Sequence, residues 1–155
     1  MTRTINLVVY SNGARPAHQA IFIPTGDTGQ KGKVIHVVGT TATGFFLQFK
    51  RNYDFSVEDR KYKVLPLAVV EDGVAKDTVG NGEPTEDTIA RDKLESVATI
   101  VQPPGPSLKP FAPGVCAGRL GRWGMLDAGC WLMNSVFFFF RPVTVRIGWQ
   151  NLWTC

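Results

Sequence analysis

Short runs of β-branched and aromatic residues, separated by turn sequences, dominate the first seventy positions of the chain. Runs of this kind, bounded by Gly, Pro, Asn or Asp, predict short strands. The expected strands occupy residues 5–10, 18–23, 33–38, 45–49 and 62–70. Since the turn sequences between them are short, the pattern predicts a meander in which neighbouring strands run antiparallel.

A helix is predicted for residues 84–102, after a polar, glycine-containing segment, 71–84, that is typical of an exposed loop. Thr85 is the expected N-cap, and the two acidic residues after it suit the positive end of the helix dipole. The spacing of apolar positions predicts one face packed on the sheet. The residues expected on that face are Ile89, Leu94, Val97, Ala98 and Val101, and those expected in solvent are Arg91, Asp92 and Glu95.

The prolines of residues 103–114 predict an extended connector after the helix, because proline restricts its own backbone and that of its predecessor. The expected fold is therefore α+β, an antiparallel sheet of about five short strands packed against one or two helices. We expect residues 1–114 to form a single domain.

Residues 115–155 differ in composition from the rest of the chain. All three cysteines and all four tryptophans lie there, and the segment contains no lysine. Four glycines and Pro142 oppose the second helix that a sheet of this kind would need. We therefore expect an irregular C-terminal tail, and a shifted reading frame or a retained intron near Val115 would explain its composition.

Composition narrows the function classes. The net charge of +4 comes mostly from scattered arginines of the tail rather than from a basic helix, so no nucleic-acid partner is expected. The most apolar stretch, residues 129–140, falls short of the roughly twenty residues of a membrane span. Without a signal-peptide core the expected location is the cytoplasm.

Three cysteines without paired spacing predict neither a disulfide framework nor a metal site, and no cofactor is expected. An uncovered apolar sheet face or the tail would favour self-association.

The two histidines of the chain provide the clearest chemical signal. His18 opens one predicted strand and His36 lies within the next. If these strands pair, both rings can project from one sheet face, because paired strands lie about 4.8 Å apart. A histidine with a pKa of about 6.5 can accept a proton from a thiol. The alternative is structural: His18 at a strand entrance, and His36 as a hydrogen-bonded core residue between Val34 and Val38.

Three stretches, H-Q-A-I-F-I-P, G-K-V-I-H-V-V-G and F-K-R-N-Y-D, resemble a family of small uncharacterised fungal proteins. More distantly, a histidine on one strand, a polar residue on the next and a later cysteine are similar to the circularly permuted papain-like superfamily. That superfamily includes the PPPDE peptidases and the lecithin retinol acyltransferase-like and NlpC/P60-like proteins.

The resemblance implies a cysteine-dependent hydrolase or acyltransferase. Cys116 would be the nucleophile, His18 its base and His36 the residue that orients the base, with backbone amides near the thiol holding the oxyanion. Two features depart from the pattern: Gln19 replaces the customary Trp, and residues 116–121 contain two glycines. Both count against activity in this chain. The alternative is a non-catalytic binding or structural protein that presents the 71–84 loop or the aromatic tail to a partner.

Overall fold

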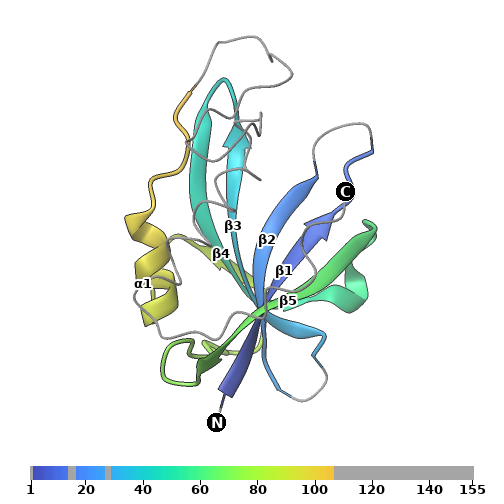
Figure 1. Ribbon diagram of the computed structural model, residues 1–155, viewed down its shortest axis with the longest axis vertical. Helices are drawn as coiled ribbons and strands as arrows, with labels where there is room; N and C mark the ends of the chain where they lie inside the picture. The colour runs from blue at the N-terminus through green and yellow to red at the C-terminus, as the bar shows by residue number, and fades with distance from the viewer. Residues whose placement is uncertain (1, 14–16, 27–28, 107–155) are drawn as a thin grey trace.

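The computed structural model describes residues 2–13, 17–26 and 29–106, which form one antiparallel sheet with a short helix on one face (Figure 1). Its α+β class agrees with the sequence pattern, and each of the five expected strands is present. The elements are β1 (Thr2–Tyr10), β2 (His18–Pro24), β3 (Lys31–Thr40), β4 (Gly44–Asp54), the 3-10 helix η1 (Phe55–Val57), β5 (Tyr62–Glu71), β6 (Thr85–Asp87) and α1 (Lys93–Ile100).

The strand order, β5-β1-β2-β3-β4-β6, corrects the expected simple meander. Strands β1 to β4 follow one another, but β5 returns to pair with β1 along its whole length, from Thr2–Glu71 to Tyr10–Tyr62. The edge of β4 is taken instead by the short β6, whose register runs from Phe49–Asp87 to Arg51–Thr85. The first strand of the chain is therefore an interior strand, which agrees with the apolar residues that it buries on both faces of the sheet.

The prediction of a helix over residues 84–102 is wrong at its start. Thr85 lies in β6, and α1 begins at Lys93 with Asp92 as its N-cap. The Oδ1 atom of Asp92 accepts a hydrogen bond of 2.8 Å from the backbone N–H of Glu95. Ile89, expected to face the sheet, is exposed, whereas Leu94 and Ala98 are buried as expected.

The two faces of the sheet carry separate apolar clusters. The face covered by α1 buries alternate strand residues such as Ile5, Ile21, Ile35 and Phe49 together with Leu94. The opposite face buries a second cluster, Val8, Tyr10, Ala20, Phe22, Val34 and Phe55. Both histidines belong to this second face, because side chains alternate along a strand and His18 and His36 are in phase with Ala20 and Val34.

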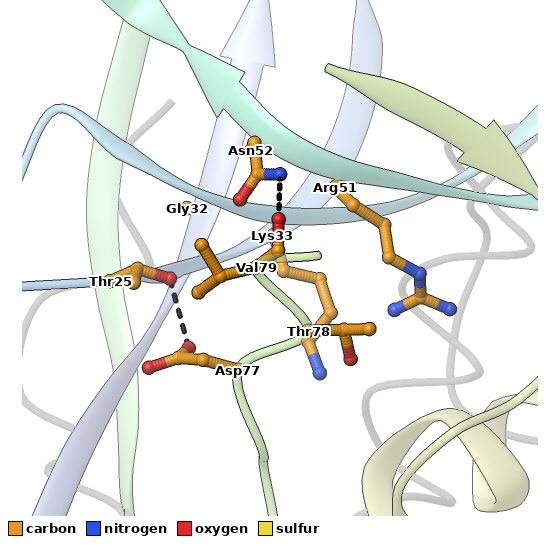
Figure 2. A pocket seen from close by; sticks show the side chains of 8 residues that line it. All are labelled: Thr25, Gly32, Lys33, Arg51, Asn52, Asp77, Thr78 and Val79. Carbon is orange, nitrogen blue, oxygen red and sulfur yellow. Dashed lines mark hydrogen bonds between the residues drawn. The ribbon is translucent and has the colours of Figure 1, made fainter. Parts of the chain in front are cut away.

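Four buried charges attach α1 to the sheet, which corrects the expectation that Asp92 and Glu95 face solvent, whereas Arg91 is exposed as expected. Lys33 and Arg51 extend from β3 and β4 on the same side of the sheet (Figure 2). The Glu95 carboxylate lies 2.9 Å from Lys33 Nζ and 2.5 Å from Arg51 Nη1, and Lys33 also bonds to Asp92. Each charge has an opposite partner, the condition under which burial of charge is tolerated.

The middle of the sheet is a narrow seam. Strands β2 and β3 pair over only four residue pairs, from Ile21–Ile35 to Pro24–Gly32. Beyond this seam the hairpin of β3 and β4 diverges from the group formed by β1, β2 and β5 (Figure 1). The start of β2 and the second half of β3 do not pair, and both contribute to the lining of a hollow.

After α1 the chain returns toward the diverging end of the sheet. The backbone N–H of Phe45 donates a hydrogen bond of 2.9 Å to the carbonyl of Pro104, beside the turn between β3 and β4. Gly44 has a φ of 84°, and a side chain there would come within 3.0 Å of Pro106. We call residues 102–106, fixed at this turn, the strap. Within the residues that the structure describes, no helix has the length and apolarity needed to cross a membrane.

Candidate active site

A chain of polar side chains crosses four strands, β2, β3, β4 and β6, on the face opposite α1. Nε2 of His18 and Nδ1 of His36 are 3.1 Å apart, and Nε2 of His36 lies 3.0 Å from Oε1 of Gln48. The amide Nε2 of Gln48 donates a hydrogen bond of 3.0 Å to Oε2 of Glu86, whose other oxygen lies 2.7 Å from Nζ of Lys50. We call His18, His36, Gln48 and Glu86 the relay.

The relay fixes the tautomer of each neutral imidazole. Because a carboxylate only accepts hydrogen bonds, the amide of Gln48 turns its NH₂ to Glu86 and its oxygen to His36. Nε2 of His36 therefore carries the proton and Nδ1 the lone pair, which accepts from Nε2–H of His18. The one remaining lone pair of the two rings is on Nδ1 of His18, so this nitrogen is the basic end of the relay.

Both histidines are held in the neutral form. Burial is the main cause that lowers the pKa of His36, to about 4, and repulsion from His18 adds to it. Burial also lowers the pKa of His18, with further repulsion from the cations Arg60 and Lys50. A neutral imidazole at pH 7 can accept a proton, as a general base requires.

A second polar chain lies beside the relay. The hydroxyl of Tyr53 donates a hydrogen bond to Glu58, and Arg60 binds the same carboxylate through Nε at 2.8 Å and Nη2 at 2.7 Å. The Arg60 guanidinium stacks 4.3 Å above the ring of Tyr10, which in turn lies 5.7 Å from the ring of His18. Tyr10 and His18 are direct partners in the pairing of β1 with β2.

The two chains border a hollow of about 420 Å³. Its lining includes Tyr10, His18, His36, Phe45, Lys50, Tyr53 and Arg60. This volume lies within the range of small-molecule sites.

A second hollow, on the α1 side between Lys33, Arg51 and Asp77, has a volume of only about 10 Å³ (Figure 2). This is about the space of a single water molecule. Its cations are already bound to the helix carboxylates, so the hollow beside the histidines is the better candidate for a ligand.

The comparisons with known proteins place the chain in a family. The sequence model of a family described as a family of unknown function, DUF6540, matches residues 5–136. The chain belongs to the DUF6540 family. No curated protein and no solved structure matches it. The part of the chain shared with DUF6540 contains the relay and also Cys116.

The structure brings His18 and His36 of this DUF6540 protein into direct contact, as their positions on neighbouring strands predicted. Cys116 lies outside the described residues. The sequence reasoning missed Gln48 and Glu86, although the hairpin signal was present: a turn at residues 40–44 places Gln48 opposite His36. Among the described residues, no group of three or more His, Cys, Asp and Glu side chains could hold a metal ion.

Gln19, the residue that departs from the customary H-W-A motif, does not point toward the relay. Since side chains alternate along β2, it lies on the α1 face while His18 lies on the other. Its Oε1 atom is buried and finds no hydrogen-bond donor in the described part of the chain. In this DUF6540 protein, the substitution therefore bears on packing under the sheet rather than on the geometry of the histidines.

Proposed function

We propose that this DUF6540 protein is a cysteine-dependent hydrolase or acyltransferase in which His18 is the general base and Cys116 the nucleophile. The observation that carries the proposal is the direction of the relay. Its hydrogen bonds leave one lone pair unused by the two imidazoles, on Nδ1 of His18 beside the hollow. A histidine whose second nitrogen is held by a polar partner is the arrangement that activates a thiol nucleophile.

In the proposed reaction the Cys116 thiol attacks an acyl carbonyl and a bond forms between sulfur and carbon. The thiol proton passes to Nδ1 of His18, the bond from the acyl carbon to the leaving group breaks, and the leaving group departs with that proton. Water in a hydrolase, or an alcohol or amine in an acyltransferase, then attacks the thioester and gives its proton to His18. The carbon–sulfur bond breaks, the acyl product leaves, and the proton returns to the thiolate. His36 is a positioning residue, because it contacts the base and not the reacting atoms, and Gln48 in turn positions His36.

The path of the chain supports this assignment. The strap at Phe45 and Pro104 directs the backbone from the α1 side to the end of the sheet that carries the hollow. Cys116 follows Pro106 by ten positions, a length that spans at most about 35 Å. The turn at Gly44 and His36 are four residues apart along β3 and β4, about 13 Å. The chain is therefore long enough for the thiol to reach His18.

A single-cysteine comparison tests the proposal. The double variant Cys130→Ser/Cys155→Ser retains only Cys116, and its alkylation by iodoacetamide is measured from pH 5 to pH 10. We expect an apparent thiol pKa below the ordinary value of about 8.5, and a return toward that value on adding His18→Ala. At pH 7 this corresponds to a several-fold loss of alkylation rate.

The matched control, Cys116→Ser/Cys130→Ser, retains only Cys155 and should alkylate with an unperturbed profile whether or not His18 is present. Replacing His36 with Gln should produce a smaller shift of the Cys116 thiol pKa than His18→Ala, since it removes the partner of the base and not the base. A Cys116 profile that is unchanged by His18→Ala contradicts the catalytic assignment and favours a binding protein.

A further inference from the structure

The charged side chains among the described residues that line the hollow beside the relay are cationic. Two cationic side chains, Lys50 from β4 and Arg60 from the segment after η1, take part in its lining. No Asp or Glu from the described residues lines it. The cations thus face the hollow without an acidic side chain in its wall.

Each cation is held from outside the hollow by one carboxylate. Glu58 binds Arg60 through two of its five N–H groups, and Glu86 binds Lys50 through one of three. Neither carboxylate lines the hollow. These contacts fix the positions of the two cations and leave further N–H donors on each, as in sites that are ordered before a ligand binds.

The electrostatic effect reaches the histidines. After burial, the charges of Arg60 and Lys50 are the causes that lower the pKa of His18. Both cations therefore lie close enough to the imidazole to influence its protonation. A negative group bound between them would also lie near the basic nitrogen of the relay.

We propose that the hollow binds an oxyanion, the carboxylate or phosphate of an acyl substrate, between Lys50 and Arg60 and beside His18. The inference rests on the proposed function in treating this anion as part of an acyl substrate. Val38 and Phe45, which also line the hollow and are only partly buried, provide apolar surface for the carbon portion. Arg is suited to planar carboxylate and phosphate groups, and Lys adds a point charge.

The test measures anion binding without thiol chemistry. Sodium phosphate and sodium acetate are titrated separately into the Cys116→Ser variant at constant ionic strength, and the imidazole signals of both histidines are followed by NMR. We expect saturable shifts and a higher pKa of His18 with the anion bound, because an opposite charge favours the imidazolium. The anion that saturates at lower concentration identifies the source, phosphate or carboxylate.

Matched neutralising variants locate the site. Lys50→Gln and Arg60→Gln should each weaken binding by about tenfold or more, whereas Lys31→Gln, which removes an exposed cation outside the hollow, should change it less than twofold. If Arg60→Gln changes amide signals throughout the protein, the fold is disturbed and Arg60→Lys is used in its place. Because Arg60→Lys keeps the positive charge, it should weaken anion binding less than Lys50→Gln does.

Shifts that rise linearly with salt, or that fall equally in Lys31→Gln and Lys50→Gln, overturn the proposal, because both outcomes describe nonspecific screening. The result is independent of the thiol. Anion binding without His18-dependent alkylation of Cys116 would support the anion site and contradict the proposed enzyme. His18-dependent alkylation without anion binding would support the proposed enzyme and contradict the anion site.

Discussion

Acidification should destabilise the fold through His36, because the folded protein holds this imidazole neutral. Its pKa falls from the ordinary 6.5 to about 4, so the unfolded chain binds a proton over this range that the folded chain excludes. The free energy of unfolding must therefore decrease as the pH falls below 6.5, and the loss is complete below about pH 4. One pKa unit corresponds to about 1.4 kcal/mol, so the full loss is about 3 kcal/mol, of which about 2 appears between pH 7 and pH 5.

Urea unfolding followed by circular dichroism from pH 7 to pH 5 measures this loss. Above pH 5 the carboxylates are largely ionised in both states, so the histidines dominate the pH dependence. Over this range the decrease for the wild type should exceed that for His36→Gln by about 2 kcal/mol. His18→Gln is the matched control, because it removes the repulsion from His18 and leaves the burial that is the main cause of the lowered pKa of His36. Only the pH dependence is compared, so a constant loss of stability in a variant does not affect the result.

Two outcomes would refute the reasoning. Equal pH dependence in the wild type and in His36→Gln would show that the buried imidazole does not exclude its proton. Stability that rises on acidification would mean that the folded protein gains a proton at the relay. The second result would also remove the neutral relay on which the proposed base, His18, depends.

Two further predictions concern the α1 face of the sheet. Glu95→Gln should lower the free energy of unfolding by about 3 kcal/mol or more in urea, because Lys33 and Arg51 lose their buried counter-charge. Lys31→Ala breaks only an exposed pair and should cost less than about 1 kcal/mol, so equal losses would contradict the role of burial. Gln19→Met should raise the stability by about 1 kcal/mol, seen as a higher thermal midpoint, because it removes a buried oxygen without a donor among the described residues. A lower midpoint would show that this oxygen is satisfied.

The strands could be predicted from sequence because their signal is local. Runs of β-branched and aromatic residues bounded by turn residues identified all five strands, and β1 and β2 end within a residue or two of the expected positions. The pairing of β5 with β1 could not be predicted in this way, since it joins residues about sixty positions apart along most of its length. Local pattern does not encode which strand occupies an edge.

The start of the helix was missed because two capping signals compete. One signal is Thr85 with its acidic neighbours. The other is Asp92 with Glu95 three positions later, which is the spacing of a capping box. The helix begins at the second signal, with Asp92 as its N-cap. Both acids were expected in solvent because their partners, Lys33 and Arg51, lie 59 and 44 positions away in the chain. A buried charge cannot be recognised from sequence until its distant partner is known.

The histidine pair shows what a sequence can indicate about a site. Contact between His18 and His36 followed from adjacent strands and a shared face. Gln48, which sets the direction of the hydrogen bonds, required the register of the β3–β4 hairpin. A polar residue on a strand does not indicate its own partner, so Gln48 could be assigned as the orienting residue only once the register was known.

In the proposed mechanism the strap also sets the effective concentration of the thiol at its base. Cys116 is twelve positions beyond Pro104, which is hydrogen-bonded to Phe45, whereas without that bond the nearest fixed point is Ile100 at the end of α1, sixteen positions away. Effective concentration falls as a connecting segment becomes longer than the span that it must cross. The buried ions that attach α1 to the sheet would therefore influence the proposed thiol, because they hold the start of this segment. On this proposal, thiol reactivity can be tuned from the buried ion cluster without altering any residue of the hollow.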